Sequence, residues 1–214
     1  MEQITLHDVL PRVFGGEEKT DSQVWRTNLV FRLGESTLVE AASGRGKSSL
    51  CSFVYGYRND YEGRITFDGD DIRTFDAARW AAVRRTSLSI LFQELRLFPE
   101  LTALENIRLK NNLTGYASPA QIEHWMEALG IAAKRDTPAA HMSLGQQQRT
   151  AFVRALCQPF DFILMDEPVS HLDEENARLM ASLLSEELQA RGAAAVVTSI
   201  GKPLPLTYKK RYAL

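Results

Sequence analysis

Residues 36–49 of the sequence read STLVEAASGRGKSS, and this stretch decides the fold. Ser36 to Glu40 predict a strand, and a helix is predicted from Gly46-Lys47 to about Tyr57. The small residues between these elements allow successive backbone N–H groups to turn inward around an anion, and the helix adds the positive end of its dipole. The stretch therefore predicts a phosphate-binding loop; the alternative is a glycine-rich turn that merely joins strand and helix.

The side chains of this loop suggest a nucleotide with a metal ion. The candidate phosphate-binding residues are consecutive: Ser43, Gly44, Arg45, Gly46, Lys47, Ser48 and Ser49. Lys47 is expected to pair with the β- and γ-phosphates, and the Ser48 hydroxyl to bind Mg²⁺. Ala41 stands where the loop pattern has glycine. If that backbone needed a positive φ, alanine would cost about 1 kcal/mol.

Two carboxylates follow the apolar run from Phe160 to Met165, which predicts a buried strand. Asp166 and Glu167 would then lie at the edge of the sheet where ligands bind in open α/β folds. Asp166 suits Mg²⁺ held through water, and Glu167 is placed to deprotonate or orient an attacking water. The alternative is an acidic turn that begins the next loop.

The rest of the chain alternates strands with helices. Strands are predicted at residues 4–9, 27–33, 64–67 and 194–200, and helices at 118–129 and 174–191. This alternation indicates an α/β protein with a largely parallel sheet. The middle third, about residues 95–157, is predicted to be mostly helical and to form its own lobe.

The amino-acid composition limits the classes of function that are expected for the chain. The chain has 214 residues, 44% of them hydrophobic, which predicts one globular domain. A net charge of −2 carries no basic excess, so no nucleic-acid partner is expected. The apolar runs are too short to span a bilayer, so any membrane role is expected to be peripheral. Both cysteines, Cys51 and Cys157, are expected to be buried, reduced thiols.

A second motif identifies a family. Residues 142–149 read MSLGQQQR and resemble the signature motif of ATP-binding cassette (ABC) ATPases, with Leu144 where the family usually has glycine. Phe92-Gln93 looks like the Q-loop of that family, and residues 170–173, SHLD, look like its D-loop. Phe14 matches the position of the aromatic residue that stacks on adenine. The resemblance extends over the whole chain, with the motifs in the family's order.

The resemblance implies a single ABC ATPase domain over residues 1–214, a P-loop NTPase of α/β class. Its RecA-like core sheet would comprise about residues 1–94 and 158–214, with a helical subdomain inserted at about 95–157. Residues 84–107 are similar to the exporter branch that includes lipoprotein-release, macrolide-efflux and cell-division ATPases.

The resemblance also implies a mechanism. Two such domains pair head to tail around two ATP molecules with Mg²⁺, either as a homodimer or with a paired ATPase subunit. Gln93 would contact Mg²⁺ and the attacking water, and Asp173 would communicate between the two sites. The signature residues would complete the partner's ATP site: Ser143, Leu144, Gly145 and Gln146. Transmembrane permease subunits would convert the cycle into transport, with this chain cytoplasmic and peripheral on the inner face of the membrane.

One catalytic position breaks the family pattern. The expected catalytic residues are Glu167, Gln93 and the residue at the switch-histidine position, which here is Ser199. Serine cannot carry a positive charge toward the γ-phosphate, so slow hydrolysis with preserved ATP binding is expected. The alternative function is an ATP-gated dimerising clamp with little hydrolysis. A chromosome-organising ATPase is disfavoured because no heptad run separates the motifs, and a small-molecule kinase leaves the signature without a role.

Overall fold

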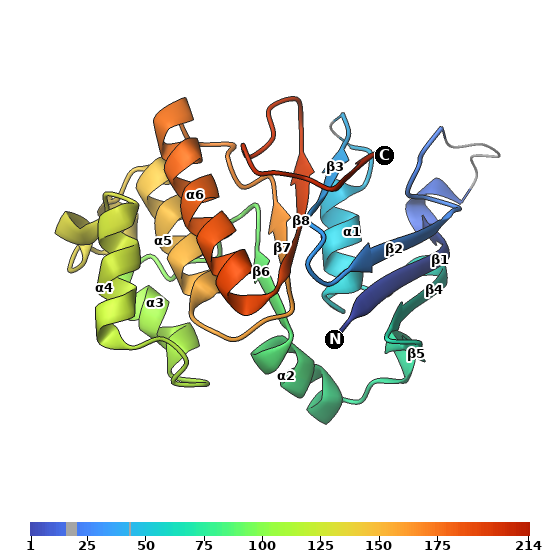
Figure 1. Ribbon diagram of the computed structural model, residues 1–214, viewed down its shortest axis with the longest axis horizontal. Helices are drawn as coiled ribbons and strands as arrows, with labels where there is room; N and C mark the ends of the chain where they lie inside the picture. Colours follow the sequence, from blue (N-terminus) through green and yellow to red (C-terminus); the bar gives the residue numbers. More distant parts are fainter. Residues whose placement is uncertain (16–20, 43) are drawn as a thin grey trace.

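A five-stranded parallel sheet forms the centre of the molecule (Figure 1). The computed structural model describes residues 1–15, 21–42 and 44–214. The strand order is β6-β7-β8-β3-β9, and each neighbouring pair is parallel. Its strands are β6 (Leu88–Leu91), β7 (Phe162–Asp166), β8 (Ala194–Ser199), β3 (Thr37–Glu40) and β9 (Lys210–Ala213). Parallel strands end at the same edge, so the loops after β3, β7 and β8 meet there.

Both faces of this sheet are covered, because side chains alternate along a strand. In β7, Phe162 and Leu164 pack into one hydrophobic cluster, whereas Ile163 and Met165 pack into the other. Every residue of β7 and β8 is buried. The near-continuous apolar sequence of these strands is therefore explained by their place inside the sheet.

One face is covered by α1 and a second sheet. Figure 1 shows α1 between the parallel sheet and an antiparallel sheet of order β2-β1-β4-β5. The elements of this side are α1 (Lys47–Val54), β1 (Gln3–Pro11), β2 (Asn28–Arg32), β4 (Tyr61–Phe67) and β5 (Asp70–Asp71). Asp8 bulges from β1 with φ of 50°, and a Cβ at Gly63 would lie 2.3 Å from its carbonyl oxygen. Glycine at residue 63 therefore permits the close approach of β4.

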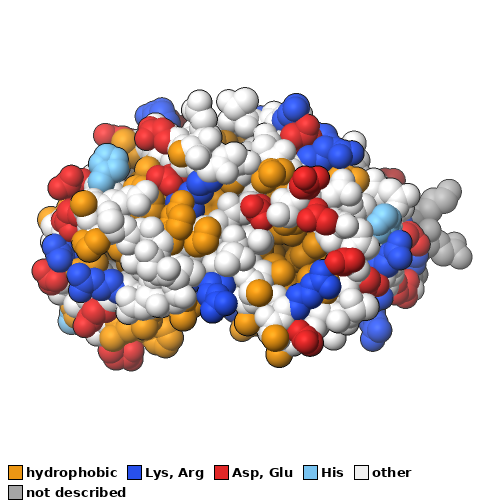
Figure 2. Space-filling view, turned by 60° about the horizontal axis from the view of Figure 1, so that its bottom comes forward, with side chains coloured by type: hydrophobic (Ala, Val, Ile, Leu, Met, Phe, Trp, Pro, Cys, Tyr) orange, Lys and Arg blue, Asp and Glu red, His pale blue; other side chains and the backbone are white. Residues whose placement is uncertain are grey.

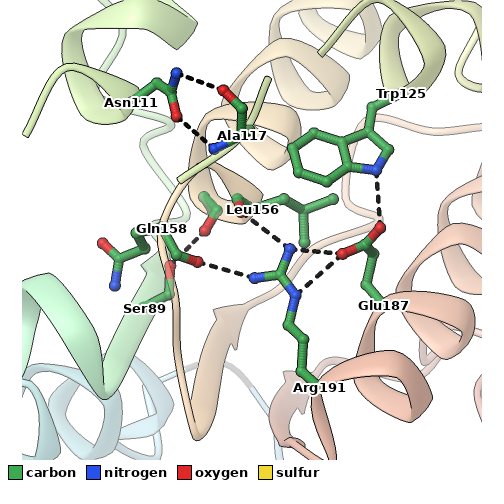
Figure 3. A network of polar contacts seen from close by, with 9 residues as sticks. Ser89, Asn111, Ala117, Trp125, Leu156, Gln158, Glu187 and Arg191 are labelled. Atoms are coloured by element: carbon green, nitrogen blue, oxygen red, sulfur yellow. Dashed lines mark hydrogen bonds and ion pairs between the residues drawn. The ribbon is translucent and has the colours of Figure 1, made fainter. Parts of the chain in front are cut away.

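Helices cover the opposite face. They are α3 (Ala103–Asn111), α4 (Pro119–Ala128), α5 (Leu144–Leu156) and α6 (Glu174–Arg191), and they share one core with the sheet. A partly buried polar network joins three of them (Figure 3). Arg191 of α6 donates to Glu187, which accepts from the Trp125 indole of α4 at 2.8 Å. Arg191 also donates to the carbonyl oxygens of Leu156 and Gln158, so the network connects three helices.

Several elements differ from the predictions. The first helix ends at Val54 rather than near Tyr57, because the chain turns at Gly56, whose φ is 68°. The buried strand is Phe162–Asp166, starting two residues later than predicted. The helix α2 (Ala77–Thr86) and the strands β6 and β9 were not predicted. No residue of α2 is fully buried, and β9 is an alternately exposed edge strand, so neither shows the apolar periodicity of a core element.

The surface is mixed in character. Figure 2 shows positively and negatively charged side chains interspersed across one face, with hydrophobic side chains between them. Within the described part of the chain, no helix is both long and apolar enough to cross a membrane.

Candidate functional site

A pocket of about 470 Å³ opens where the loops after β3 and β7 meet. It brings together most of the predicted phosphate-loop residues with Phe14, Gln93 and Glu167. Its lining consists of Val13, Phe14, Gly44, Gly46, Lys47, Ser48, Ser49, Arg58, Gln93, Glu167 and Ile200. A larger groove of about 790 Å³ shares only Arg58 with it and contains none of the predicted site residues. The smaller pocket is therefore the candidate site.

Lys47 is the buried cation of the pocket, with 4% of its side chain exposed. Its ammonium group donates to the carbonyl oxygens of Ala41 and Ala42, at 3.1 and 2.8 Å, and lies 3.7 Å from Glu167 Oε1. Ala41 has no positive φ, so alanine is not strained there and the cost considered from the sequence does not arise. Within the described part of the chain, the carboxylate paired with Lys47 is thus 3.7 Å away, which leaves the ammonium group able to bind phosphate.

Two aromatic side chains support the loop. Gly46 has φ of 94°, and a Cβ there would lie 3.2 Å from both the Phe14 and Trp25 rings. The Trp25 indole donates to the carbonyl oxygen of Arg45 at 3.2 Å. Glycine at residue 46 is needed for both its φ and its space. Sequence reasoning missed Trp25, because nothing in its local pattern links it to the loop.

Oxygen-bearing side chains lie beside Lys47. The Ser48 hydroxyl and Gln93 Oε1 are 3.3 Å apart. Asp166 is buried and accepts a hydrogen bond from the Thr198 hydroxyl at 2.7 Å. Thr198 also holds the backbone of Glu167, because the carbonyl oxygen and the hydroxyl of Thr198 each lie 3.2 Å from the Glu167 backbone nitrogen. Serine, glutamine and aspartate oxygens are ligands suited to Mg²⁺.

No cluster of three or more His, Cys, Asp or Glu side chains within the described ranges could hold a metal ion. Mg²⁺ commonly takes only one or two protein carboxylates and completes its shell with water and phosphate oxygens. Ser48, Gln93 and Asp166 fit that arrangement, so this set of residues suits a metal ion that arrives with a nucleotide.

The predicted signature residues lie outside this pocket. Ser143 begins α5 through a capping box: its hydroxyl accepts from the Gln146 backbone, and the Gln146 side chain accepts from the Ser143 backbone. Leu144 is exposed, and a Cβ at Gly145 would lie 3.0 Å from the carbonyl oxygen of His171. The structure therefore presents the signature on a separate surface, next to the D-loop segment.

Asp173 also lies outside the pocket, as the cap of α6. Hydrogen bonds from the backbone and side chain of Asn176 hold the pKa of Asp173 below its usual range. Asn176 in turn accepts from Arg149 of α5 at 2.5 Å. The buried Gln148, which sequence reasoning missed, donates to Pro168 and accepts from the His171 backbone. These contacts hold the signature helix against the loop that follows β7.

Two further predicted residues, Ser199 and Ser43, do not line the pocket as the structure describes it. Ser199 is buried, with 2% exposed, and its carbonyl oxygen accepts from the Ala41 backbone. It does not line the pocket, whereas the next residue, Ile200, does. Ser43 lies outside the described residues.

A family model described as ABC transporter matches residues 25–170. The chain is 31% identical over 191 residues to the macrolide export ATP-binding/permease protein MacB of Shewanella sp. (strain W3-18-1), covering 88% of this chain but 29% of that protein. It is 32% identical over 168 residues to the ABC transporter ATP-binding protein YtrE of Bacillus subtilis (strain 168), covering 77% and 72%. It is 27% identical over 190 residues to the lipoprotein-releasing system ATP-binding protein LolD of Hahella chejuensis (strain KCTC 2396), covering 87% and 82%.

Solved structures are similar as well. The ATP-binding cassette MJ0796, in a dimeric post-hydrolysis state bound to ADP and Pi, superposes with a TM-score of 0.75 at 26% identity, covering 92% of this chain and 87% of that chain. A second dimeric structure of MJ0796 gives a TM-score of 0.73 at 27% identity, covering 91% and 87%.

Proposed function

This chain belongs to the ABC transporter family, and we propose that it binds Mg-ATP in the pocket around Lys47 and hydrolyses it to ADP and phosphate. The motor role, in which hydrolysis energises transport or force transmission through partner transmembrane subunits, is part of the same proposal. The exporter-type names of the relatives support it.

One observation carries the proposal: three separate segments deliver complementary chemistry to one pocket. The start of α1 contributes Lys47 and Ser48, the segment after β6 contributes Gln93, and the end of β7 contributes Glu167. Lys47 offers positive charge to phosphate oxygens, and the first turn of α1 adds its unpaired N–H groups. A structural pocket has no need for a buried lysine whose partners among the described residues are two carbonyl oxygens and a carboxylate 3.7 Å away.

The chemistry follows from these groups. Glu167, held by two contacts from Thr198 to its backbone, orients the attacking water and accepts its proton. Ser48, Gln93 and, through water, Asp166 would hold Mg²⁺, which neutralises phosphate charge. Phe14 offers an aromatic surface for the adenine. Ser43 to Ser49 form the phosphate loop in this proposal, with Ser43 assigned from the sequence alone.

The exposed signature predicts a second subunit. Residues Ser143 to Gln146 would complete the ATP site of a head-to-tail partner, either another copy or a paired ATPase subunit, with Asp173 at the same interface. The dimeric MJ0796 structures support this arrangement. We place the RecA-like core at about residues 1–94 and 158–214 and the helical subdomain at about 95–157. We also propose a location on the cytoplasmic face of a membrane, next to transmembrane permease subunits.

Ser199 favours a second candidate function. Its side chain is buried, carries no charge and does not reach the pocket, so the γ-phosphate lacks the polar contact that a histidine there would supply. A chain of this kind could bind ATP and dimerise as a clamp while turning over slowly.

Phosphate release from Mg-ATP tests the proposal, with the unmodified chain compared with Glu167→Gln. The substitution keeps shape and hydrogen bonding but removes the base, so turnover is expected to fall by roughly a hundredfold or more while ATP binding remains. Turnover that is equal in both proteins would contradict the assignment of Glu167. Binding without turnover in either protein would favour the clamp.

A further inference from the structure

Arg58 lines the pocket, but no predicted motif includes it. Its guanidinium group forms two hydrogen bonds with the Asp60 carboxylate, at 2.8 and 2.5 Å. The remaining terminal nitrogen, Nη1, donates to the Ser49 hydroxyl at 3.1 Å. The guanidinium carbon lies 5.3 Å from the centre of the Phe53 ring. These contacts hold Arg58 against the helix that begins at the phosphate loop.

The hydrogen bond between Arg58 and Ser49 can run in only one direction, from donor to acceptor. A guanidinium has no acceptor, so the Ser49 oxygen must accept the hydrogen bond. A hydroxyl also has one proton to donate, and none of the residues that the structure describes accepts it in a hydrogen bond. Ser49 faces the pocket, so the open space around that proton is the space assigned to the nucleotide. Arg58 therefore leaves the Ser49 hydroxyl oriented as a donor.

We propose that Arg58 is a positioning residue, which orients the Ser49 hydroxyl to donate to a phosphate oxygen of the bound nucleotide. This inference rests on the proposed function of the pocket. Asp60 keeps the guanidinium group in place. The hydrogen bonds between the two side chains raise the pKa of Arg58 and lower the pKa of Asp60. Both side chains are more than two-fifths exposed, so the pair contributes orientation more than stability.

The position of Ser49 indicates which phosphates it serves. Ser48 contacts Gln93, whereas Ser49, about 100° further around the helix, contacts Arg58. Glu167, where hydrolysis is proposed, lies 3.7 Å from Lys47, whereas Ser49 has its side-chain contact with Arg58. The Ser49 contact is thus expected to serve a phosphate that ATP and ADP share, and its loss should weaken both nucleotides equally.

The test is a double-mutant cycle of Arg58→Gln and Ser49→Ala, with dissociation constants for ATP and ADP measured by titration calorimetry. Arg58→Gln removes the orientation of the Ser49 hydroxyl but keeps the hydroxyl, so both constants should rise by about three- to tenfold, less than the complete loss of a hydrogen bond to a charged ligand would give. In the Ser49→Ala background, Arg58→Gln should have no further effect, because the hydroxyl that it orients is absent. The KM for ATP should rise more than kcat falls.

Arg79 provides the matched control. It is 46% exposed against 42% for Arg58, pairs with Asp70, and lies 3.8 Å from the centre of the Phe75 ring, but it does not line the pocket. Arg79→Gln should leave both dissociation constants unchanged, and melting temperatures will show whether each variant is folded.

Unchanged nucleotide affinity in folded Arg58→Gln, or losses that simply add in the double variant, would overturn the inference but leave the proposed function intact. Failure of the unmodified chain to bind either nucleotide would overturn both.

Discussion

Two buried cations, Lys47 and Arg191, lie in different surroundings. Both are almost fully covered, with 4% and 7% of their side chains exposed. Arg191 forms its ion pair with Glu187 at 2.5 Å and donates to two carbonyl oxygens (Figure 3). Its guanidinium carbon also lies 4.3 Å from the centre of the Phe160 ring. Lys47 has two carbonyl partners and a carboxylate at 3.7 Å.

The difference separates a structural site from a binding site. Arg191 donates its hydrogen bonds to groups within the protein, so it stabilises the contact between helices and is not available to bind a ligand. Lys47 is desolvated but incompletely neutralised, and it borders a pocket. An anion that enters the pocket would interact strongly with Lys47, because the lysine side chain is already desolvated in the folded chain. Substitutions at the two positions should therefore have opposite effects on binding and stability.

The largest expected effect is on nucleotide binding by Lys47→Ala. Removing one or two charge-assisted hydrogen bonds should raise the dissociation constant for ATP roughly a hundredfold or more. The melting temperature should change little, because the ion pair with Glu167 that is broken is long, at 3.7 Å. Calorimetric titration with ATP and a thermal melt measure both quantities. A large loss of stability without loss of affinity would place Lys47 with Arg191 as a structural residue.

The converse is expected for Arg191→Ala. It leaves Glu187, whose side chain is only 13% exposed, without its ion-pair partner, which should lower the free energy of unfolding by about 3 kcal/mol. The ATP affinity of the folded fraction should stay the same. Denaturant-induced unfolding measures the change in stability, and ATP titration at denaturant concentrations below the unfolding transition measures the affinity.

A paired replacement provides the control for Arg191→Ala. The double variant Glu187→Leu/Arg191→Leu removes both charges and should be less destabilised than Arg191→Ala alone. A double variant that is as unstable as the single one would mean that the carbonyl contacts, and not the ion pair, dominate.

A smaller effect is expected from Ser199→His, which restores the histidine side chain that the family pattern has at this position. Turnover of Mg-ATP should rise by about tenfold, since a positioned donor or acid accelerates such reactions. The change is limited because residue 199 is buried beside Ala41, and the melting temperature will report any strain. Unchanged turnover in a folded variant would show that this position does not limit hydrolysis.

The smallest effect concerns two cysteines that report on the two regions. Cys51 lies in α1 next to the phosphate loop, and Cys157 follows α5 beside the Arg191 network. Burial raises the pKa of Cys157 to about 12 and that of Cys51 well above its usual range. Because the thiolate is the reactive form, both should label slowly at pH 8 in the native chain, through local opening.

Nucleotide should distinguish the two thiols. At ten times its dissociation constant, ATP should slow labelling of Cys51 by about tenfold and that of Cys157 much less. Peptide mapping of labelled protein measures both rates. Equal protection of the two thiols would show that the regions open together as one unit.

The predicted and observed structures agree best where the determining contacts are local. The cap at Ser118 and the end of α6 at Gly192, whose φ is 62°, were predicted because both depend on neighbouring residues. The phosphate loop and the acidic pair were predicted because strand, turn and helix signals adjoin them. The family and the ATPase fold followed from the order of these motifs and are confirmed by the comparisons.

The sequence by itself determined many of the strands and helices, the α/β class with a largely parallel sheet, and the chemistry of the candidate groups. Only the tertiary structure decided which groups meet: Arg58 with Ser49, Trp25 with Arg45, and Gln148 with the loop after β7. These contacts join residues distant in sequence, and they form because burying apolar faces brings the segments together and excludes water. A hydrophobic pattern specifies that a face is buried but not which polar group lies opposite it. The sequence pattern assigned Lys47 to phosphate binding, whereas only the folded chain shows that Arg191 is enclosed in a polar network between helices.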